Sequence, residues 1–222
     1  MMMRRLVHIL MCAVAVWSFS SCEKEESFNY GDFRYDMVTY AGENGKSSVF
    51  TFQSYEDSPL VTLTANNLTK SGLKVGQRLF LNYIVDEDVN ETTKVVDVKG
   101  FSKVTTDSIV FVPQEVLDTL TRDKMKVVSA WRTGEYLNIR CRLEYTEKPR
   151  RLFLATNGEI DAEGVINAYQ IQNLMGAKTY YWLETYLSYY IGTAWNNENC
   201  KVLRYNAPDW SYTEGRFFDF KK

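Results

Sequence analysis

Short runs in which apolar and polar positions alternate cover most of the chain, and such alternation is typical of β-strands. In the first half, the expected strands lie at 48–52, 60–64, 79–85, 93–98 and 107–112. The segment 79–85 is apolar on both faces, as expected for a central strand of a closed barrel. Residues 33–113 therefore predict a small barrel. A linker at 114–125 follows, in which apolar residues at helical spacing predict a short connecting helix.

The second half has a different strand pattern. Along 137–145, apolar residues point one way and polar residues the other, which indicates an antiparallel sheet with one solvent-exposed face. Further strands are expected at 151–155, 165–172, 182–191, 200–205 and 216–220. For 182–191 a helix is the alternative, because its leucine and isoleucine residues also recur every four positions. Roughly six or seven strands at this spacing predict a β-sandwich over 126–222.

Composition supports the all-β class and limits the function. The 222 residues include 15 Tyr and 12 Phe, and aromatic side chains favour strands. The formal net charge is −2, and the first 21 residues contain two arginines and no acid, so the remainder carries −4. Because an acidic excess provides no basic surface for a phosphate backbone, we expect no nucleic-acid partner.

The first 21 residues have the parts of a secretory signal peptide, with two arginines, a largely apolar core at 6–17 and small residues before Cys22. The core is shorter than the ~20 residues that cross a bilayer. Ser20 and Ser21 before Cys22 resemble a bacterial lipobox, although Phe19 replaces the usual Leu. The resemblance implies cleavage before Cys22 and attachment of acyl chains such as palmitate, two or more of which anchor a protein stably. An ordinary signal peptide with an incidental cysteine is the alternative.

Residues 22–32 are polar and predict a tether. The acidic run at 23–26 resembles an export signal that takes lipoproteins to the surface of some gut and oral anaerobes. A solvated linker is the alternative, because charged linkers stay extended. We therefore expect an outer-membrane lipoprotein that is exposed on the cell surface or, alternatively, faces the periplasm.

Histidine occurs once, at His8 inside the expected signal peptide, so the mature protein would contain none. Histidine-based metal sites, Ser-His-Asp triads and Cys-His dyads are thereby excluded. Two acidic clusters remain, one around Asp88 that partly follows a calcium-binding loop and one around Asp161. Glu91 and Asp97 stand where that loop requires Gly and Glu. We interpret both clusters as solvated turns, and we expect no metal, no cofactor and no catalytic residue.

Apart from Cys22, the mature chain contains two cysteines, Cys141 and Cys200. Outside the cytosol such a pair can form a disulfide. Because the loop between them is long, a bridge would stabilise the fold by roughly 4 kcal/mol on the chain-entropy account. Two buried free thiols are the alternative.

If 182–191 is a strand, Trp182, Tyr186 and Tyr190 share one face, with polar residues between them. Aromatic rings interleaved with polar groups can form a ligand platform, because the rings stack on a ligand and the polar groups orient it. Sandwich packing with a few exposed tyrosines is the alternative.

Two three-residue sequences, Asp107-Ser108-Ile109 and Asp118-Thr119-Leu120, resemble an O-glycosylation signal of the same anaerobes. Thr119 in the linker is the better acceptor, because Ser108 lies in an expected strand.

Several segments together resemble the NigD-like lipoproteins. They are VGQRL at 75–79 with the strand that follows, WRTGEYLNI at 131–139, YTEKPR at 145–150, the run 185–195 and a Phe-rich final strand ending at Phe220. The resemblance implies an N-terminal OB-like barrel and a C-terminal β-sandwich over nearly the whole mature chain. The family name comes from a bacteriocin gene neighbourhood, which suggests an immunity role. The resemblance offers no catalytic residues, and fold alone does not define function.

From these observations we expect a lipid-anchored, non-catalytic binding or interaction module of the cell envelope, for which bacteriocin immunity is one version. A surface glycan-binding accessory protein is the alternative, supported by the aromatic face around Trp182. An enzyme that uses carboxylates alone is a third hypothesis. The expected partners are the membrane, through the lipid, and an unidentified protein or glycan.

Overall fold

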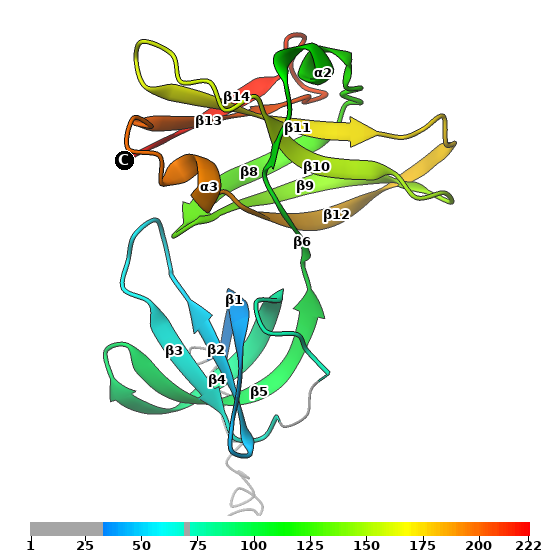
Figure 1. The fold of residues 1–222 in the computed structure, drawn as a ribbon. Coiled ribbons are helices and arrows are strands. Elements are labelled where there is room, and N and C mark those ends of the chain that lie inside the picture. The colour runs from blue at the N-terminus through cyan, green and yellow to red at the C-terminus, as the bar shows by residue number, and fades with distance from the viewer. Residues whose placement is uncertain (1–32, 69–71) are drawn as a thin grey trace, which may run out of the picture. The chain divides into compact units, whose positions relative to one another are not determined.

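The computed structural model describes residues 33–68 and 72–222 (Figure 1). These residues form β-strands joined by turns and two short helices, so the predicted all-β class is confirmed. The expected signal peptide at 1–21, the lipidation site Cys22 and the tether at 22–32 lie outside the described residues. Within the described ranges, no helix has the length and apolar character needed to cross a membrane.

The first strands close into a barrel in the order β1-β2-β3-β5-β4, which agrees with the expected OB-like barrel. The strands are β1 (Phe33–Asn44), β2 (Ser47–Phe52), β3 (Val61–Ala65), β4 (Arg78–Asn90) and β5 (Thr93–Lys103). Leu79, Leu81 and Tyr83 of β4 point into the barrel, where they are buried with Phe50 and Leu63. One apolar face of the segment 79–85 therefore serves the barrel core, as predicted.

Strand β1 does not stand out in the sequence, because its register is interrupted. A β-bulge between Tyr40 and Gly42 shifts the pairing of β1 with β2. Gly42 has φ +118°, a conformation that residues with side chains rarely adopt. The bulge interrupts the alternation of apolar and polar residues by which the other strands were recognised.

The remaining strands form two sheets that face each other across a second core (Figure 1). The five-stranded sheet, in the order β14-β13-β11-β10-β7, contains β7 (Val110–Phe111), β10 (Arg151–Thr156), β11 (Val165–Asn173), β13 (Val202–Ala207) and β14 (Arg216–Lys221). The four-stranded sheet, in the order β6-β12-β9-β8, contains β6 (Thr105–Ser108), β8 (Lys126–Thr133), β9 (Tyr136–Thr146) and β12 (Thr179–Tyr190). Buried residues of both sheets, among them Ile139, Leu187 and Leu203, form one cluster, so the predicted β-sandwich is confirmed.

Strand β12 decides between the two structures considered for 182–191. It pairs antiparallel with β9, from Trp182 opposite Glu144 to Tyr190 opposite Tyr136. The strand prediction is confirmed and the helical alternative is wrong. The chain then turns into the short helix α3 (Gly192–Trp195).

The border between barrel and sandwich differs from the expected one. Strand β6 pairs in parallel with β12, and β7 pairs in parallel with β10. Residues 105–111 therefore belong to the sandwich, whereas we expected them in a barrel at 33–113. The sandwich has nine strands because the expected strand at 107–112 is two separate strands and because β8 had not been recognised. Short edge strands depend on tertiary pairing, so their own sequences show little alternation.

The predicted short helix is present as α2 (Gln114–Thr119), inside the expected linker at 114–125. Its Leu117 is buried against Ala155 and Ile171 on the outer face of the five-stranded sheet. Figure 1 shows α2 beside this sheet, before the chain continues into β8. The helix thus covers part of the sheet and places the residues that follow it next to β11 and β13.

Arg78, at the start of β4, connects the barrel to the sandwich. It is 3% exposed. Its Nε donates a hydrogen bond to Ser188 Oγ (3.1 Å), and its Nη2 donates to Asn138 Oδ1 (3.0 Å). Within the barrel, Nη1 donates to Thr39 Oγ1 (3.0 Å), and the guanidinium carbon lies 4.5 Å from the centre of the Tyr136 ring. Burial lowers the pKa of Arg78 to about 10, so the group stays cationic at neutral pH.

Two further contacts reinforce this connection. Phe80, on the outer face of β4, meets the Tyr186 ring edge-on, with 4.5 Å between the ring centres. Arg132 in β8 is 3% exposed and donates to both carboxylate oxygens of Asp57, at 2.8 and 2.6 Å. The hydrogen bond from Arg132 lowers the pKa of Asp57. With these contacts, Phe33–Lys222 form one compact unit.

Candidate functional site

The three aromatic residues predicted as a ligand platform share one face of β12 but have different neighbours. Tyr186 packs against Phe80 of the barrel. Tyr190 lies edge-on to a tyrosine of β9, with 5.7 Å between the ring centres. Trp182, at the other end of the strand, lies edge-on to Trp210 at 6.3 Å. The rings therefore do not gather into one platform, and of the three it is Trp182 that reaches the loop between β13 and β14.

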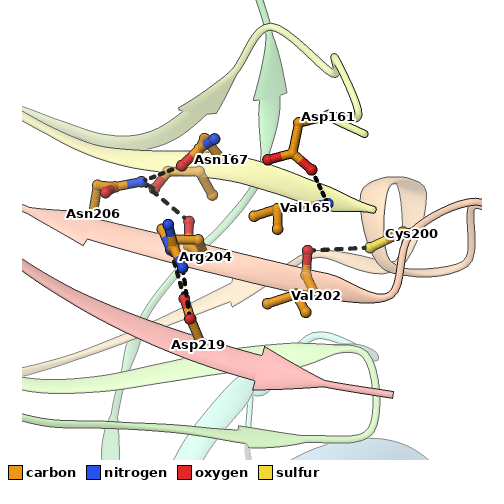
Figure 2. A network of polar contacts seen from close by, with 9 residues as sticks. Asp161, Val165, Asn167, Cys200, Val202, Arg204, Asn206 and Asp219 are labelled. Carbon is orange, nitrogen blue, oxygen red and sulfur yellow. Dashed lines mark hydrogen bonds and ion pairs between the residues drawn. The ribbon is translucent and has the colours of Figure 1, made fainter. Parts of the chain in front are cut away.

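Cys141 and Cys200 are both buried and both free, so the predicted disulfide is wrong and the alternative of two buried thiols holds. Cys141 lies in β9, where its thiol donates to the carbonyl oxygen of Thr185 at 3.5 Å. Cys200 precedes β13, and its thiol donates to the carbonyl oxygen of Val202 at 3.6 Å (Figure 2). Each thiol is thus satisfied by nearby backbone. Burial raises the pKa of Cys141 to about 12, so it keeps its proton at neutral pH.

The two acidic clusters have structural partners. Asp161 Oδ1 accepts hydrogen bonds from the backbone N–H groups of Glu163 and Val165, both at 2.9 Å, in a turn that leads into β11. Figure 2 shows the bond from Val165. Asp88 lies in the exposed end of β4 instead of in a turn, and it forms an ion pair with Lys94. Among residues 33–68 and 72–222, no group of three or more His, Cys, Asp or Glu side chains is arranged to hold a metal ion.

Both hydroxyl groups of the glycosylation-like sequences are in exposed residues. Ser108 ends the edge strand β6, and Thr119 ends α2. Thr119 Oγ1 donates to the carbonyl oxygen of Val116 at 2.8 Å. Modification of either residue stays a prediction.

A cavity of about 430 Å³ lies beside the loop between β13 and β14. Its walls come from the segment between α2 and β8, from β11 and from the β13–β14 hairpin. We call it the hairpin cavity, and its principal lining residues are Arg122, Lys124, Tyr169, Asp209, Arg216 and Phe217. Its volume falls within the ~300–1,000 Å³ that is typical of small-molecule sites.

The loop that bounds the hairpin cavity is held in place by Asp209, which is 1% exposed. Its carboxylate accepts hydrogen bonds from the backbone N–H groups of Val127 (3.1 Å) and Ser211 (2.8 Å). A backbone bridge also pairs Asp209 with Met125. At the end of the loop, Gly215 has φ +86°, and a Cβ there would lie 2.7 Å from a carbonyl oxygen of β13. Only glycine fits without strain, so this wall has a defined conformation.

Two arginines of the cavity lie over aromatic rings. The guanidinium carbon of Arg122 is 4.3 Å from the centre of the Tyr169 ring, and its Nη2 donates to a carbonyl oxygen of α2 at 3.3 Å. The guanidinium carbon of Arg216 is 4.4 Å from the centre of the Phe218 ring, and the Nη1 of Arg216 donates to a carbonyl oxygen of β8 at 3.3 Å. Stacking positions the planar guanidinium while leaving most of its N–H donors available to another partner.

The charged residues that line the cavity have a positive balance. The cations are Arg122, Lys124 and Arg216, and the acids are Asp209 and Glu214. No ion pair joins any of these three cations to a carboxylate within the described residues. The Asp209 carboxylate is occupied by backbone N–H groups, so Glu214 in the exposed loop is the acid that opposes the cations most directly.

A polar network continues from the cavity along β13 (Figure 2). Asn206, which lines the cavity, donates from Nδ2 to Asn167 Oδ1 at 3.1 Å. Arg204 forms a bidentate pair with Asp219 of β14, at 2.7 and 2.8 Å, and stacks over Phe217 at 4.7 Å. The hydrogen bond from Arg204 lowers the pKa of Asp219. Because Arg204 is neutralised in this way, it adds no unpaired positive charge beside the cavity.

Sequence reasoning missed the hairpin cavity because its cations are far apart along the chain. Arg122 and Lys124 follow α2, whereas Arg216 begins β14. The local signal was the segment 208–215, in which Pro, Asp and Gly indicate turns and which also contains Trp210 and Tyr212. That signal predicts an exposed aromatic loop, but it does not reveal which cations the loop meets.

The barrel and the sandwich define a two-part, all-β architecture with a cationic cavity in its second part. A protein of unknown function from Bacteroides vulgatus ATCC 8482 shares the fold at 17% identity and a TM-score of 0.69, over 86% of this chain and 90% of that one. A NigD-like immunity protein from Bacteroides caccae ATCC 43185 shares it at 18% identity and a TM-score of 0.59, over 84% and 91%. A protein from Bacteroides fragilis NCTC 9343 that is provisionally named a lipoprotein does so at 10% identity and a TM-score of 0.61, over 85% and 96%.

Comparison of the sequence with models of protein families and with curated proteins finds no match. The shared fold with the NigD-like immunity protein confirms the expected resemblance at the level of the fold. At these identities, the likeness carries no residue roles over to this chain.

Proposed function

We propose that this protein is a lipid-anchored lipoprotein of the cell envelope that binds a ligand at the hairpin cavity without transforming it. The observation that carries the proposal is the pair of arginines in the cavity, Arg122 and Arg216, which are stacked on aromatic rings and have no carboxylate partner among the described residues. Such groups suit binding, because little side-chain freedom remains to be lost when a ligand arrives.

The non-catalytic part of the proposal follows from the acids of the cavity. Acid–base chemistry by carboxylates needs two groups whose surroundings separate their pKa values. Asp209 is already the acceptor for two backbone N–H groups, and Glu214 lies in the exposed loop. With His8 in the expected signal peptide, the mature chain would also lack an imidazole. Binding without turnover is the function that these groups support best.

Lipid attachment at Cys22 is tested by metabolic labelling. The lipobox-like sequence supports it, as does a shared fold with a Bacteroides protein provisionally named a lipoprotein. Cells that produce the chain are grown with an alkyne analogue of palmitate, and the protein is compared with the Cys22→Ser variant. We expect label and outer-membrane retention for the natural chain alone. An unlabelled natural chain that still carries residues 1–21 would exclude the anchor.

Surface exposure is a separate part of the proposal, supported by the acidic run at 23–26. Intact cells treated with protease should lose the protein, whereas a periplasmic control should survive. Complete protection would place the protein on the periplasmic face instead.

Bacteriocin immunity is a specific version of the proposal, supported by the shared fold with a NigD-like immunity protein from Bacteroides caccae. Deleting the gene should increase sensitivity to the cognate bacteriocin, and restoring it should reverse the effect. Unchanged sensitivity would remove this version and leave the binding proposal in place.

Glycan binding is the second candidate, and the surroundings of the hairpin cavity favour it. Trp210, Tyr212 and Phe217 are 52%, 47% and 61% exposed, and Phe217 also lines the cavity. Aromatic faces next to a concave polar site are a common arrangement for small ligands, because a ring provides stacking area and polar groups provide orientation. A glycan array probed with the full chain tests this candidate, and retention on no glycan would leave a protein partner.

A further inference from the structure

The hairpin cavity combines a positive charge balance with exposed rings, and both limit the chemistry of its ligand. A guanidinium group presents its N–H donors as a planar fork that matches the oxygen atoms of a carboxylate, sulfate or phosphate. Arg122 and Arg216 each use a single described hydrogen bond, to a backbone carbonyl oxygen. Their remaining donors are suited to an anionic group.

Lys124 strengthens this preference, because its ammonium group is not used by the fold. Its side chain is exposed and lines the cavity, and none of the hydrogen bonds or ion pairs of the described residues involves its ammonium group. A neutral ligand would leave three cations unmatched, with Glu214 as the opposing acid. An anionic ligand would reduce the repulsion among them.

The size of the cavity favours a short ligand segment over a folded protein. A stable protein interface buries ~800 Å² on each partner. The hairpin cavity instead has a volume of about 430 Å³, lies between the loop held by Asp209 and the sheet, and is partly open to solvent. Its aromatic rim is the exposed ring of Phe217, and Trp210 and Tyr212 are exposed in the loop that bounds the cavity. Such rings can stack on the C–H faces of sugar rings.

We infer that the hairpin cavity binds an anionic sugar, in which a carboxylate or sulfate group contacts the arginines and a neighbouring ring stacks on the aromatic rim. This inference rests on the proposed binding function and names the ligand class for it. The recognised chemistry is the anionic sugar unit, whichever of the two acidic groups it carries.

Calorimetric titration of the full chain in detergent tests the inference with four probes. They are trigalacturonate, its fully methyl-esterified form, a sulfated chondroitin oligosaccharide and sodium sulfate. We expect one of the two anionic sugars to bind at least roughly tenfold more tightly than the ester and than sodium sulfate, since hydrogen bonds to charged groups contribute this much. The carboxylate and sulfate arms distinguish the two sources of charge. Tighter binding of sodium sulfate than of either sugar would indicate a simple anion site and overturn the inference.

Variants then locate the binding. Arg122→Gln should weaken the anionic sugar roughly tenfold, and Lys124→Gln should weaken it a few-fold. Because the Lys124 ammonium has no described partner, the second variant should melt at the temperature of the natural chain, which separates loss of binding from loss of fold. Arg140→Gln is the matched control, because Arg140 lies on β9 and is paired with Glu184. It should bind like the natural chain.

The opposing outcomes are distinct. Equal affinity for the acid and its ester, or binding that survives both cavity variants, would overturn the inference, as would binding of neither anionic sugar. If the glycan array still retains the chain on neutral glycans, the proposed binding function stands and the anionic class fails. If neither the array nor the titration detects a ligand, the glycan candidate fails with it.

Discussion

Replacing Arg78 by Met tests whether a buried guanidinium stabilises the contact between barrel and sandwich. Arg78 donates three hydrogen bonds, and bonds from a charged donor contribute ~1.5–3 kcal/mol each, or roughly 5–9 kcal/mol together. Burial opposes this, because the fall in its pKa from 12.5 to about 10 corresponds to roughly 3 kcal/mol. The difference leaves a net stabilisation of roughly 2–6 kcal/mol.

The groups left behind decide where in that range the result should fall. Ser188 Oγ also donates to Asn138 Oδ1 at 2.8 Å, and Asn138 Nδ2 donates to Thr133 Oγ1 at 2.9 Å. Removing Arg78 therefore orphans no buried acceptor in the sandwich, and Met retains much of the apolar stem. We expect the Arg78→Met variant to lose about 2 kcal/mol of unfolding free energy.

Urea denaturation of the mature chain, followed by tryptophan fluorescence, measures this loss. Trp131 packs against the cluster that includes Phe80 and reports on the contact. Arg140→Met is the control, since Arg140 forms an exposed ion pair and such pairs contribute below ~1 kcal/mol. If Arg78→Met is as stable as the natural chain within ~0.5 kcal/mol, or more stable, burial outweighs the hydrogen bonds and the reasoning fails.

Three further outcomes are expected. Burial raises the pKa of Cys141 to about 12, and Cys200 is also buried, so iodoacetamide at pH 8 should leave both thiols unmodified in the folded chain and modify both in urea. A disulfide-linked Cys141–Cys200 peptide in a non-reducing digest would contradict the structure. Gly215→Ala should lower the unfolding free energy by about 2 kcal/mol, because φ is +86° and the added Cβ meets a carbonyl oxygen; an unchanged melting temperature would refute the predicted strain. Arg204 lowers the pKa of Asp219, so this carboxylate stabilises the fold above its unfolded pKa near ~4 and loses that effect as pH falls through the folded pKa. The Asp219→Asn variant should therefore show a weaker dependence of unfolding free energy on pH between pH 5 and pH 2. An unaltered slope would count against the ion pair.

Strand patterns in the sequence predicted much of the fold, because burial of one face of a strand leaves an alternation of apolar and polar residues. The alternation along 137–145 corresponds to β9, whose Leu137, Ile139, Cys141 and Leu143 lie in the sandwich core. Strands β6 and β7 could not be placed in this way. They are held by parallel pairing with β12 and β10, which are distant in sequence, and their residues are largely exposed. Whether such segments form strands, and in which sheet, depends on the strands they pair with more than on their own residues.

The candidate site was less accessible to the same reasoning. Tyr169 and Arg122 meet because α2 lies against the outer face of the five-stranded sheet, which directs the following segment over β11. The cysteine pair illustrates a related limit. Counting residues identified Cys141 and Cys200, but whether two thiols pair depends on where their backbones lie, and in this fold each thiol contacts a carbonyl oxygen near its own strand.

Two of the sequence signals acquire a common explanation in the structure. The segment 79–85 looked apolar on both faces, and the aromatic face of β12 looked like a ligand platform. Phe80 from the first segment and Tyr186 from the second are in contact, with 4.5 Å between their ring centres, so part of each signal arises from one interface inside the protein. An aromatic face that belongs to such an interface is not available to a ligand. The aromatic residues near the β13–β14 loop differ, because Trp210, Tyr212 and Phe217 remain exposed, and Phe217 lines the cavity together with cations that have no carboxylate partner. The search for a ligand therefore belongs on the hairpin cavity, at the five-stranded sheet, and not on the part of β12 that the barrel contacts.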